Sequence, residues 1–416
     1  MTKRLILAFV FLSWHLVACS NGDSGISSGL PDKPSAEEDS PGTETISEEM
    51  RVKITGEDLY ISAKLDAKTD ILYWFKKCMF NELFTFYRVG TIDNNMPAPA
   101  TLPDASPTSL LNLAYSDNIG PFNITGYGWC GGNHPYLDEV TQTARNIGYR
   151  IYIDGKEIKT DLSTLTKEIK IEVINEIMNP SKADTSSGKT LLNEILCIET
   201  VNYSIYRNNI QVLVTHEFQN ESPVTVQMYY GMQSMFDKET HTLTANGKYV
   251  DWTVQKDVST FTKKEYPSFR RFIEKSANVY QSSYLFADGL GNHEEISDDD
   301  IIFIGNSSNK TYHKIIADRE HKKGDIIHWS GVYTWFKSPV SDDDDLLCYE
   351  GVIDNKKVLF IDCKKNVDRT IQLPVDYTKK SFTIIEKSKS ITITGNKVTA
   401  KGLRIVSDGS GSCVIT

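Results

Sequence analysis

The residues best suited to chemistry gather in one short stretch, 126–136, which reads Gly-Tyr-Gly-Trp-Cys-Gly-Gly-Asn-His-Pro-Tyr. His134 could transfer a proton near neutral pH or bind a sugar hydroxyl. Trp129 and Tyr136 could stack on a sugar ring, and the Asn133 amide could bind hydroxyls beside them. In the plainer alternative, His134 bonds the backbone of its own loop and both rings anchor that loop in the core. Four glycines weaken strand and helix alike, so we expect a shaped loop here.

A second candidate stretch, 229–233, reads Tyr-Tyr-Gly-Met-Gln and ends a predicted strand. Adjacent strand residues point to opposite faces, so only one of Tyr229 and Tyr230 can reach a given pocket. A tyrosine near a base can donate a proton in β-elimination of a uronate-containing glycan, and a cation such as Arg270 or Arg271 can offset the charge that develops on the carboxylate. Taken singly, packed tyrosines and surface arginines are the plainer interpretation. Two further residues that could line this pocket are Gln233 and His241.

His216 lies in a predicted strand, 210–218. Counting by two places it on the apolar face with Val212 and Val214, whereas Glu217 points to the other face. We therefore expect a buried histidine with its hydrogen bonds satisfied. It becomes a candidate catalytic base only if a cleft opens on that face.

Metal and cofactor sites are not predicted. The other histidines lack ligand spacings such as His-x-His, and the acidic runs 297–300 and 341–345 lack the glycine-bearing turn of a calcium loop. A pair of catalytic carboxylates, as in glycosidases, remains open because residues far apart in sequence can meet about 5–10 Å apart in space.

The N-terminus predicts export. Lys3 and Arg4 precede an apolar run, 5–17, which is too short for a membrane span and ends in Leu16-Val17-Ala18-Cys19. This ending resembles the bacterial lipobox, which implies that residues 1–18 are removed and that Cys19 carries the lipid. The alternative is an ordinary secretory signal, and both interpretations take the chain out of the cytosol.

A polar tether follows the predicted lipid anchor. Residues 20–48 are rich in Ser, Gly, Pro, Asp and Glu, so 19–48 should stay a flexible connection to the membrane. An anchor followed by such a tether resembles Bacteroidota lipoproteins of the outer membrane that face the cell surface or periplasm, many of which handle glycans. The net charge of −10 and pI of about 5.4 argue against a nucleic-acid partner.

Six of the seven cysteines lie after Cys19, and none forms a Cys-x-x-Cys pair. Cys348 and Cys363 flank a predicted hairpin, and a turn centred on 355–356 would place them directly opposite each other. A cross-strand disulfide is then possible outside the cytosol, and two buried thiols are the alternative.

The body of the chain predicts an all-β fold. Alternating polar and apolar residues in most segments favour antiparallel sheets, including a three-strand meander over 196–230; a short helix is expected only near 268–276. The predicted fold resembles the large antiparallel β-sandwich, or supersandwich, of mutarotases and some polysaccharide lyases, which holds about this many strands. We expect this main domain over 49–368 and a small β-sandwich over 369–416, similar to modules that close secreted glycan-active proteins.

Three functions fit these observations. The first is an exported lipoprotein that acts on a polysaccharide, as a lyase or glycosidase. The second is a glycan-binding lipoprotein without catalysis, which needs only the aromatic residues and a polar rim. The third is a structural or adhesion protein, in which the aromatic residues belong to the core. An enzyme requires that His134, a tyrosine and a charged group converge in a cleft.

Overall fold

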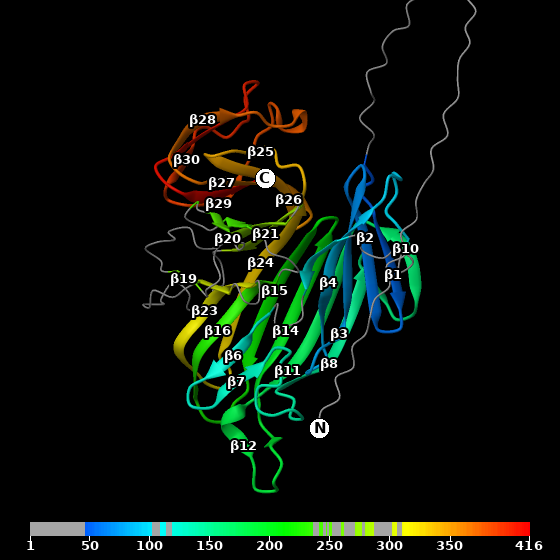
Figure 1. Cartoon of the computed structure of the whole chain (residues 1–416), viewed down its shortest axis with the longest axis vertical. Helices are drawn as coiled ribbons and strands as arrows, with labels where there is room; N and C mark the ends of the chain where they lie inside the picture. The colour runs from blue at the N-terminus through cyan, green and yellow to red at the C-terminus, as the bar shows by residue number, and fades with distance from the viewer. Residues whose placement is uncertain are drawn as a thin grey trace, which may run out of the picture. The chain divides into compact units, whose positions relative to one another are not determined.

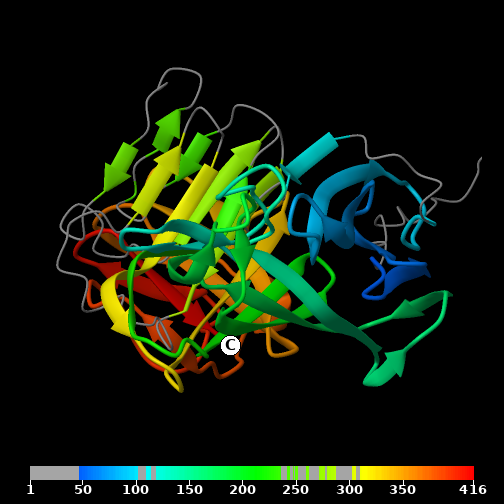
Figure 2. The ribbon, with the colours of Figure 1, turned by 90° about the horizontal axis from the view of Figure 1, so that it is seen from below.

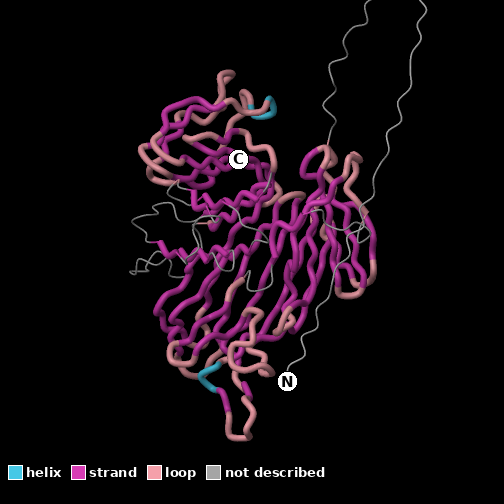
Figure 3. The backbone as a smooth tube through the Cα atoms, viewed as in Figure 1, coloured by secondary structure: helices cyan, strands magenta, loops and turns pink. Residues whose placement is uncertain are grey.

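The computed structural model describes residues 46–101, 109–113, 119–235, 241–243, 247, 249–251, 259–261, 271–276, 279–286, 302–305 and 310–416. The chain divides into two units, 1–43 and 44–416, and all described residues belong to the second. In these ranges, regular structure consists of β-strands and two short 3-10 helices, Pro180–Lys182 and Val375–Tyr377 (Figure 3). All strand pairs are antiparallel, so the predicted all-β fold is confirmed.

The N-terminal sheet has the strand order β10-β1-β2-β3-β4-β5. Its strands are β1 (Met50–Thr55), β2 (Asp58–Asp66), β3 (Thr69–Cys78), β4 (Leu83–Asp93), β5 (Ser109–Leu113) and β10 (Leu162–Thr166). The alternation in β2 follows the prediction, because Leu59, Ile61 and Ala63 are buried together on one face. On the other face, Lys64 and Asp70 form a buried ion pair of 2.8 Å.

The central sheet is the largest, with the order β18-β17-β20-β21-β24-β15-β14-β11-β8-β9. Its strands are β8 (Ala144–Ile153), β9 (Lys156–Ile158), β11 (Ile169–Met178), β14 (Ile195–Tyr206), β15 (Asn209–Phe218), β17 (His241–Leu243), β18 (Tyr249–Asp251), β20 (Arg271–Ser276), β21 (Val279–Leu285) and β24 (Ile326–Phe336). A two-stranded sheet of β12 (Ala183–Asp184) and β13 (Leu191–Leu192) lies between β11 and β14 in the chain. Two-residue turns at 154–155 and 207–208 join β8 to β9 and β14 to β15.

The lateral sheet carries the aromatic candidates and has the order β19-β22-β23-β16-β6-β7. Its strands are β6 (Pro121–Ile124), β7 (Gly128–Gly131), β16 (Val224–Met235), β19 (Ser259–Phe261), β22 (Ile302–Gly305) and β23 (Lys310–His321). Together with the N-terminal sheet it packs on one face of the central sheet (Figures 1 and 2). Phe75 of the N-terminal sheet contacts Tyr203, and Phe122 of the lateral sheet contacts His216.

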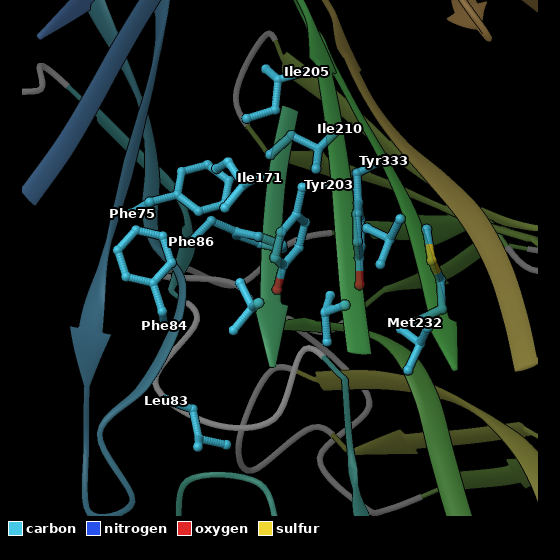
Figure 4. Packing of buried hydrophobic residues seen from close by; sticks show 14 of the residues in the cluster. Phe75, Leu83, Phe84, Phe86, Ile171, Tyr203, Ile205, Ile210, Met232 and Tyr333 are labelled. Carbon is cyan, nitrogen blue, oxygen red and sulfur yellow. The ribbon is translucent and has the colours of Figure 1, made fainter. Parts of the chain in front are cut away.

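The main hydrophobic core fills the space between these layers. Figure 4 shows Phe75, Phe84 and Phe86 facing Tyr203 and Tyr333 of the central sheet. Period-two alternation in the facing strands turns their apolar side chains to this interior, which is the arrangement of a β-sandwich. The prediction of a large antiparallel sandwich is confirmed at this level.

Near the C-terminus lie two smaller sheets. The five-stranded one packs on the opposite face of the central sheet, and the three-stranded one packs on the five-stranded one. Their strands are β25 (Ser341–Asp342), β26 (Leu346–Ile353), β27 (Lys356–Cys363), β28 (Val367–Ile371), β29 (Ile384–Lys387), β30 (Ile391–Ile393), β31 (Leu403–Ser407) and β32 (Gly411–Ile415). One sheet has the order β25-β26-β27-β32-β29 and the other the order β28-β31-β30. Residue 368 lies within β28, and β27 pairs with β32 across that point of the chain.

Three sequence expectations about strands are wrong. Gly128–Gly131 forms a strand, because β6 supplies its backbone partners. Arg271–Ser276 is a strand of the central sheet and not part of a helix. Val224–Met235 does not continue the meander: β15 pairs with β24, and β16 crosses to the lateral sheet. The sequence shows local alternation but does not identify which strands pair.

The predicted opposition of Cys348 and Cys363 is also wrong. The hairpin turns at 354–355, so Cys348 lies opposite Ile361 and Cys363 lies opposite Leu346. Cys348 is a buried free thiol, and burial raises its pKa. A one-residue shift of a hairpin turn is enough to separate two side chains that would otherwise meet.

Candidate functional site

The β6–β7 hairpin presents Trp129 on the outer face of the lateral sheet. In the hairpin, Phe122 pairs with buried Cys130, and Asn123 pairs with half-buried Trp129. Directly opposed residues share a face, so the first pair turns inward and the second outward. After β7 the chain turns at Gly132, with φ of +57°, and its carbonyl accepts a 2.7 Å hydrogen bond from Asn81.

A row of half-buried aromatic rings continues from Trp129 across this outer face. The ring of Trp129 lies 6.0 Å from that of Tyr230 and 6.2 Å from that of Tyr136, and both pairs are stacked. Tyr230 lies 5.1 Å from Tyr312 of β23, and His134 meets Tyr136 edge-on at 5.6 Å. We call Tyr312, Tyr230, Trp129, Tyr136 and His134 the aromatic row; its contacts run in that order.

The loop after the row is shaped by Asp138. Its carboxylate accepts hydrogen bonds from the backbone N–H of Val140 at 2.9 Å and from the Thr141 hydroxyl at 2.8 Å. These bonds favour the charged form and lower the pKa of Asp138 to about 2. The loop therefore keeps a charged cap at all physiological pH values.

Tyr229 points away from the aromatic row, into the core. Its hydroxyl donates to the Ile119 carbonyl at 2.7 Å and accepts from Trp329 Nε1 at 2.9 Å. Burial raises its pKa well above the usual value. As predicted, the two adjacent tyrosines separate, and only Tyr230 belongs to the row.

His216 is buried on the inner face, as the alternation of β15 predicts. Its Nε2 lies 2.9 Å from Glu199 Oε2, and the ring packs edge-on against Tyr229 at 5.0 Å. The other oxygen of Glu199 accepts a 2.9 Å hydrogen bond from Asn175. A buried carboxylate needs such partners. The expectation that His216 has all its hydrogen bonds satisfied is wrong at Nδ1, which is buried with no hydrogen-bond partner among the described residues.

A small pocket borders the same carboxylate. Glu199 lines it together with Tyr203, Gly120 and Asn133. Asn133 is only 3% exposed, and its backbone carbonyl accepts from the Phe80 N–H at 3.2 Å. Asn133 thus lies on the interior side of the loop and not on the aromatic row.

The remaining predicted site residues are spread over other elements. Gln233 of β16 is 2% exposed, and its carbonyl accepts from the Tyr333 hydroxyl at 2.7 Å. His241 is exposed on β17, and Arg271 lies in β20 opposite Tyr284. Arg270 lies outside the described residues.

The structure therefore joins four of the predicted residues and separates the others. His134, Trp129, Tyr136 and Tyr230 lie in one row, whereas Tyr229 and His216 are buried behind the sheet. The sequence analysis did not identify Tyr312, which belongs to the aromatic row, or Glu199, which is the hydrogen-bond partner of His216. Tyr312 required the pairing of β16 with β23, but Glu199 lies on the apolar period of β14 and could have been found by counting.

No group of three or more His, Cys, Asp or Glu side chains in the described ranges could hold a metal ion. Across the same part of the chain, no helix has the length and apolar character needed to cross a membrane.

Comparisons with known proteins give weak structural likenesses. No protein-family model matches the chain, and no curated protein matches it in sequence. The galactosidase domain of the α-galactosidase–sucrose kinase AgaSK aligns with 68% of this chain and 42% of that chain, at 10% identity and a TM-score of 0.36. The family 36 α-galactosidase AgaB from Geobacillus stearothermophilus aligns with 72% and 41%, at 9% identity and a TM-score of 0.35.

A putative aldose 1-epimerase from Klebsiella pneumoniae aligns with 68% of this chain and 82% of that chain, at 8% identity and a TM-score of 0.27. The chain spans less than half the length of the two galactosidase chains. Likenesses at these identities and TM-scores carry no conclusion about what this chain does.

Proposed function

We propose that this chain is an exported lipoprotein, anchored to the outer membrane through Cys19, that binds a polysaccharide without cleaving it. The observation that supports binding is the aromatic row on the outer face of the lateral sheet. Half-exposed rings of tryptophan and tyrosine offer apolar faces to sugar rings while their polar atoms reach hydroxyls. Successive spacings of 5.1, 6.0 and 6.2 Å give a polymer several contacts along the row.

The same geometry favours binding over lyase chemistry. A lyase needs a base, a proton donor and a charge-stabilising group around one reacting carbon. Among the tyrosine and histidine candidates, Tyr229 and His216 lie behind the sheet, and the contacts of the row place Trp129 and Tyr136 between Tyr230 and His134. A row of rings is suited to holding a chain of sugars, which requires no tuned base.

Affinity gel electrophoresis on a panel of polysaccharides tests this proposal. At least one neutral or acidic polysaccharide should retard the wild-type protein, and Trp129→Ala and Tyr230→Ala should each raise its dissociation constant about tenfold, equivalent to about 1.4 kcal/mol. Tyr152→Ala, which removes a half-buried ring from β8, is the matched control and should leave retardation unchanged.

Three outcomes would overturn the proposal. If no polysaccharide retards the protein, the structural or adhesion function is favoured. If a polysaccharide is consumed, with new absorbance at the unsaturated-uronate band that His134→Ala abolishes, the protein is a lyase. Reducing ends without that absorbance would instead point to a glycosidase and its carboxylates.

A further inference from the structure

A cleft of about 320 Å³ is lined by residues none of which belongs to the aromatic row. The cleft lies where the β14–β15 turn, the end of β24 and the β26–β27 hairpin come together. Phe336, Leu65 and Val352 supply apolar lining, and Asn208 and Ser338 add polar groups. Clefts of this size between packed layers are common locations of small-ligand sites.

Positive charge is the distinguishing feature of this cleft. Four of its lining residues are cationic, namely Lys167, Arg207, Lys337 and Lys357, and two are acidic, namely Glu48 and Glu350. Lys337 is held by Asp66 at 2.8 Å, and Lys357 by Glu350 at 2.8 Å. Among the described residues, Lys167 and Arg207 have no ion-pair partner within 4.0 Å. This local excess of cations contrasts with the net charge of −10 for the chain.

Arg207 is poised to bind an anion. A guanidinium carries five N–H donors. Among the described residues, the Arg207 side chain makes one hydrogen bond, in which Nη2 donates to the Lys64 carbonyl at 3.5 Å. Its backbone has a φ of +47°, and its carbonyl accepts a 2.9 Å hydrogen bond from the Tyr73 hydroxyl. The turn is thus fixed, and Nε of Arg207 is buried with no hydrogen-bond partner among the described residues, so this donor gains from an acceptor that enters the cleft.

We propose that this cleft binds a small organic oxyanion, a monosaccharide-sized ligand that carries a carboxylate or a sulfate. Arg207 and Lys167 bind the charged group, and the half-buried side chains of Leu65 and Val352 contact the body of the ligand. The site is separate from the aromatic row and does not depend on the function proposed for it.

Isothermal titration of the full chain tests the site, with glucuronate, glucose 6-sulfate, neutral glucose and inorganic sulfate at constant ionic strength. We expect at least one of the two charged sugars to bind at millimolar concentration or better, with weaker binding at high salt. Lys167→Gln and Arg207→Gly should each weaken that binding about threefold to tenfold. Glycine is chosen at 207 because it adopts positive φ without strain, and circular dichroism checks that the variant folds.

Controls separate this site from the aromatic row. Lys189→Gln, in the exposed connection between β12 and β13, should leave oxyanion binding unchanged, as should Trp129→Ala. Absence of binding by both charged sugars up to about 20 mM would overturn the proposal. The proposal would also be overturned if neutral glucose or inorganic sulfate bound as tightly as the charged sugars. It would likewise be overturned if Lys167→Gln and Arg207→Gly both bound the charged sugars as tightly as the wild type.

Discussion

At the scale of single residues, the burial of Glu199 and His216 is predictable from the sequence. They lie directly opposite each other in the β14–β15 hairpin, whose two-residue turn sets the register. The alternation of β15 was enough to predict a buried His216, and the same count along β14 places Glu199 with Val201 and Tyr203. Tyr312 is different, because its place beside Tyr230 depends on a pairing between distant segments that local pattern does not specify.

His321 should make the stability of the fold depend on pH. The ring is 2% exposed and stacks on Phe218 at 4.3 Å. Burial is the main cause that lowers its pKa to about 4, Arg319 lowers it further, and Asp325 acts in the opposite direction. The unfolded chain takes up this proton below about pH 6.5, but the folded chain resists it until about pH 4. The stability that the neutral ring contributes above pH 6.5 is therefore lost as the pH falls through this window.

Urea unfolding at pH 7 and pH 5 measures the effect. The free energy of unfolding should fall by on the order of 1–2 kcal/mol through His321. His321→Phe keeps a ring against Phe218 but cannot bind a proton, so it should show a correspondingly smaller loss. An equal loss in wild type and variant would show that other groups cause the pH dependence.

At the scale of elements, the β6–β7 hairpin shows why composition alone was insufficient. Four glycines argued against a regular element, but strand pairing needs only a backbone partner and a turn, and Gly126 supplies that turn with a φ of +81°. The hairpin then pairs with β16, so Trp129 and Tyr230 reach one face. The position of the candidate site in the sequence was thus predictable, whereas its local secondary structure was not.

Gly120 should be essential for docking this hairpin onto β16. Its φ is +96°, and a Cβ there would lie 1.6 Å from the Tyr230 carbonyl oxygen. Gly120→Ala must therefore push β6 away from β16, and we expect a loss of about 2–4 kcal/mol in the free energy of unfolding and weaker polysaccharide retention. Urea unfolding and affinity gels measure the two effects.

Gly126→Ala is the matched control for this substitution. Its φ is also positive, at +81°, but an added Cβ meets open space. Only backbone strain remains, which costs about 1–2 kcal/mol. The steric explanation for Gly120 fails if the two variants lose equal stability.

At the scale of the whole molecule, the C-terminal sheets should unfold together with the main body because of a shared aromatic stack. Tyr349 of β26 stacks on Phe336 of the central sheet at 4.4 Å and on Phe360 of β27 at 5.0 Å. Its hydroxyl also lies 2.6 Å from that of Ser282. Strand content and alternation were predictable from sequence, but this packing joins residues whose contact no local pattern indicates.

Tyr349→Ala should uncouple the two parts. All tryptophans precede Phe336, so their fluorescence reports on the main body, whereas circular dichroism reports on all strands. In the wild type the two unfolding curves should coincide. In the variant, circular dichroism should begin to change at lower urea, with a loss of about 3–5 kcal/mol in the C-terminal part. Coincident curves in the variant would contradict this coupling.

The pairing of β1 with β10 also has a consequence for the time the chain needs to fold. Met50 lies opposite Thr166, and Asn209 of β15 lies opposite Thr334 of β24, so both pairs close long stretches of chain. The entropy of closing these stretches must be lost before the contacts form, which makes such folds slow. During that interval the strand edges stay open to other chains, so a molecular chaperone that shields them would limit aggregation.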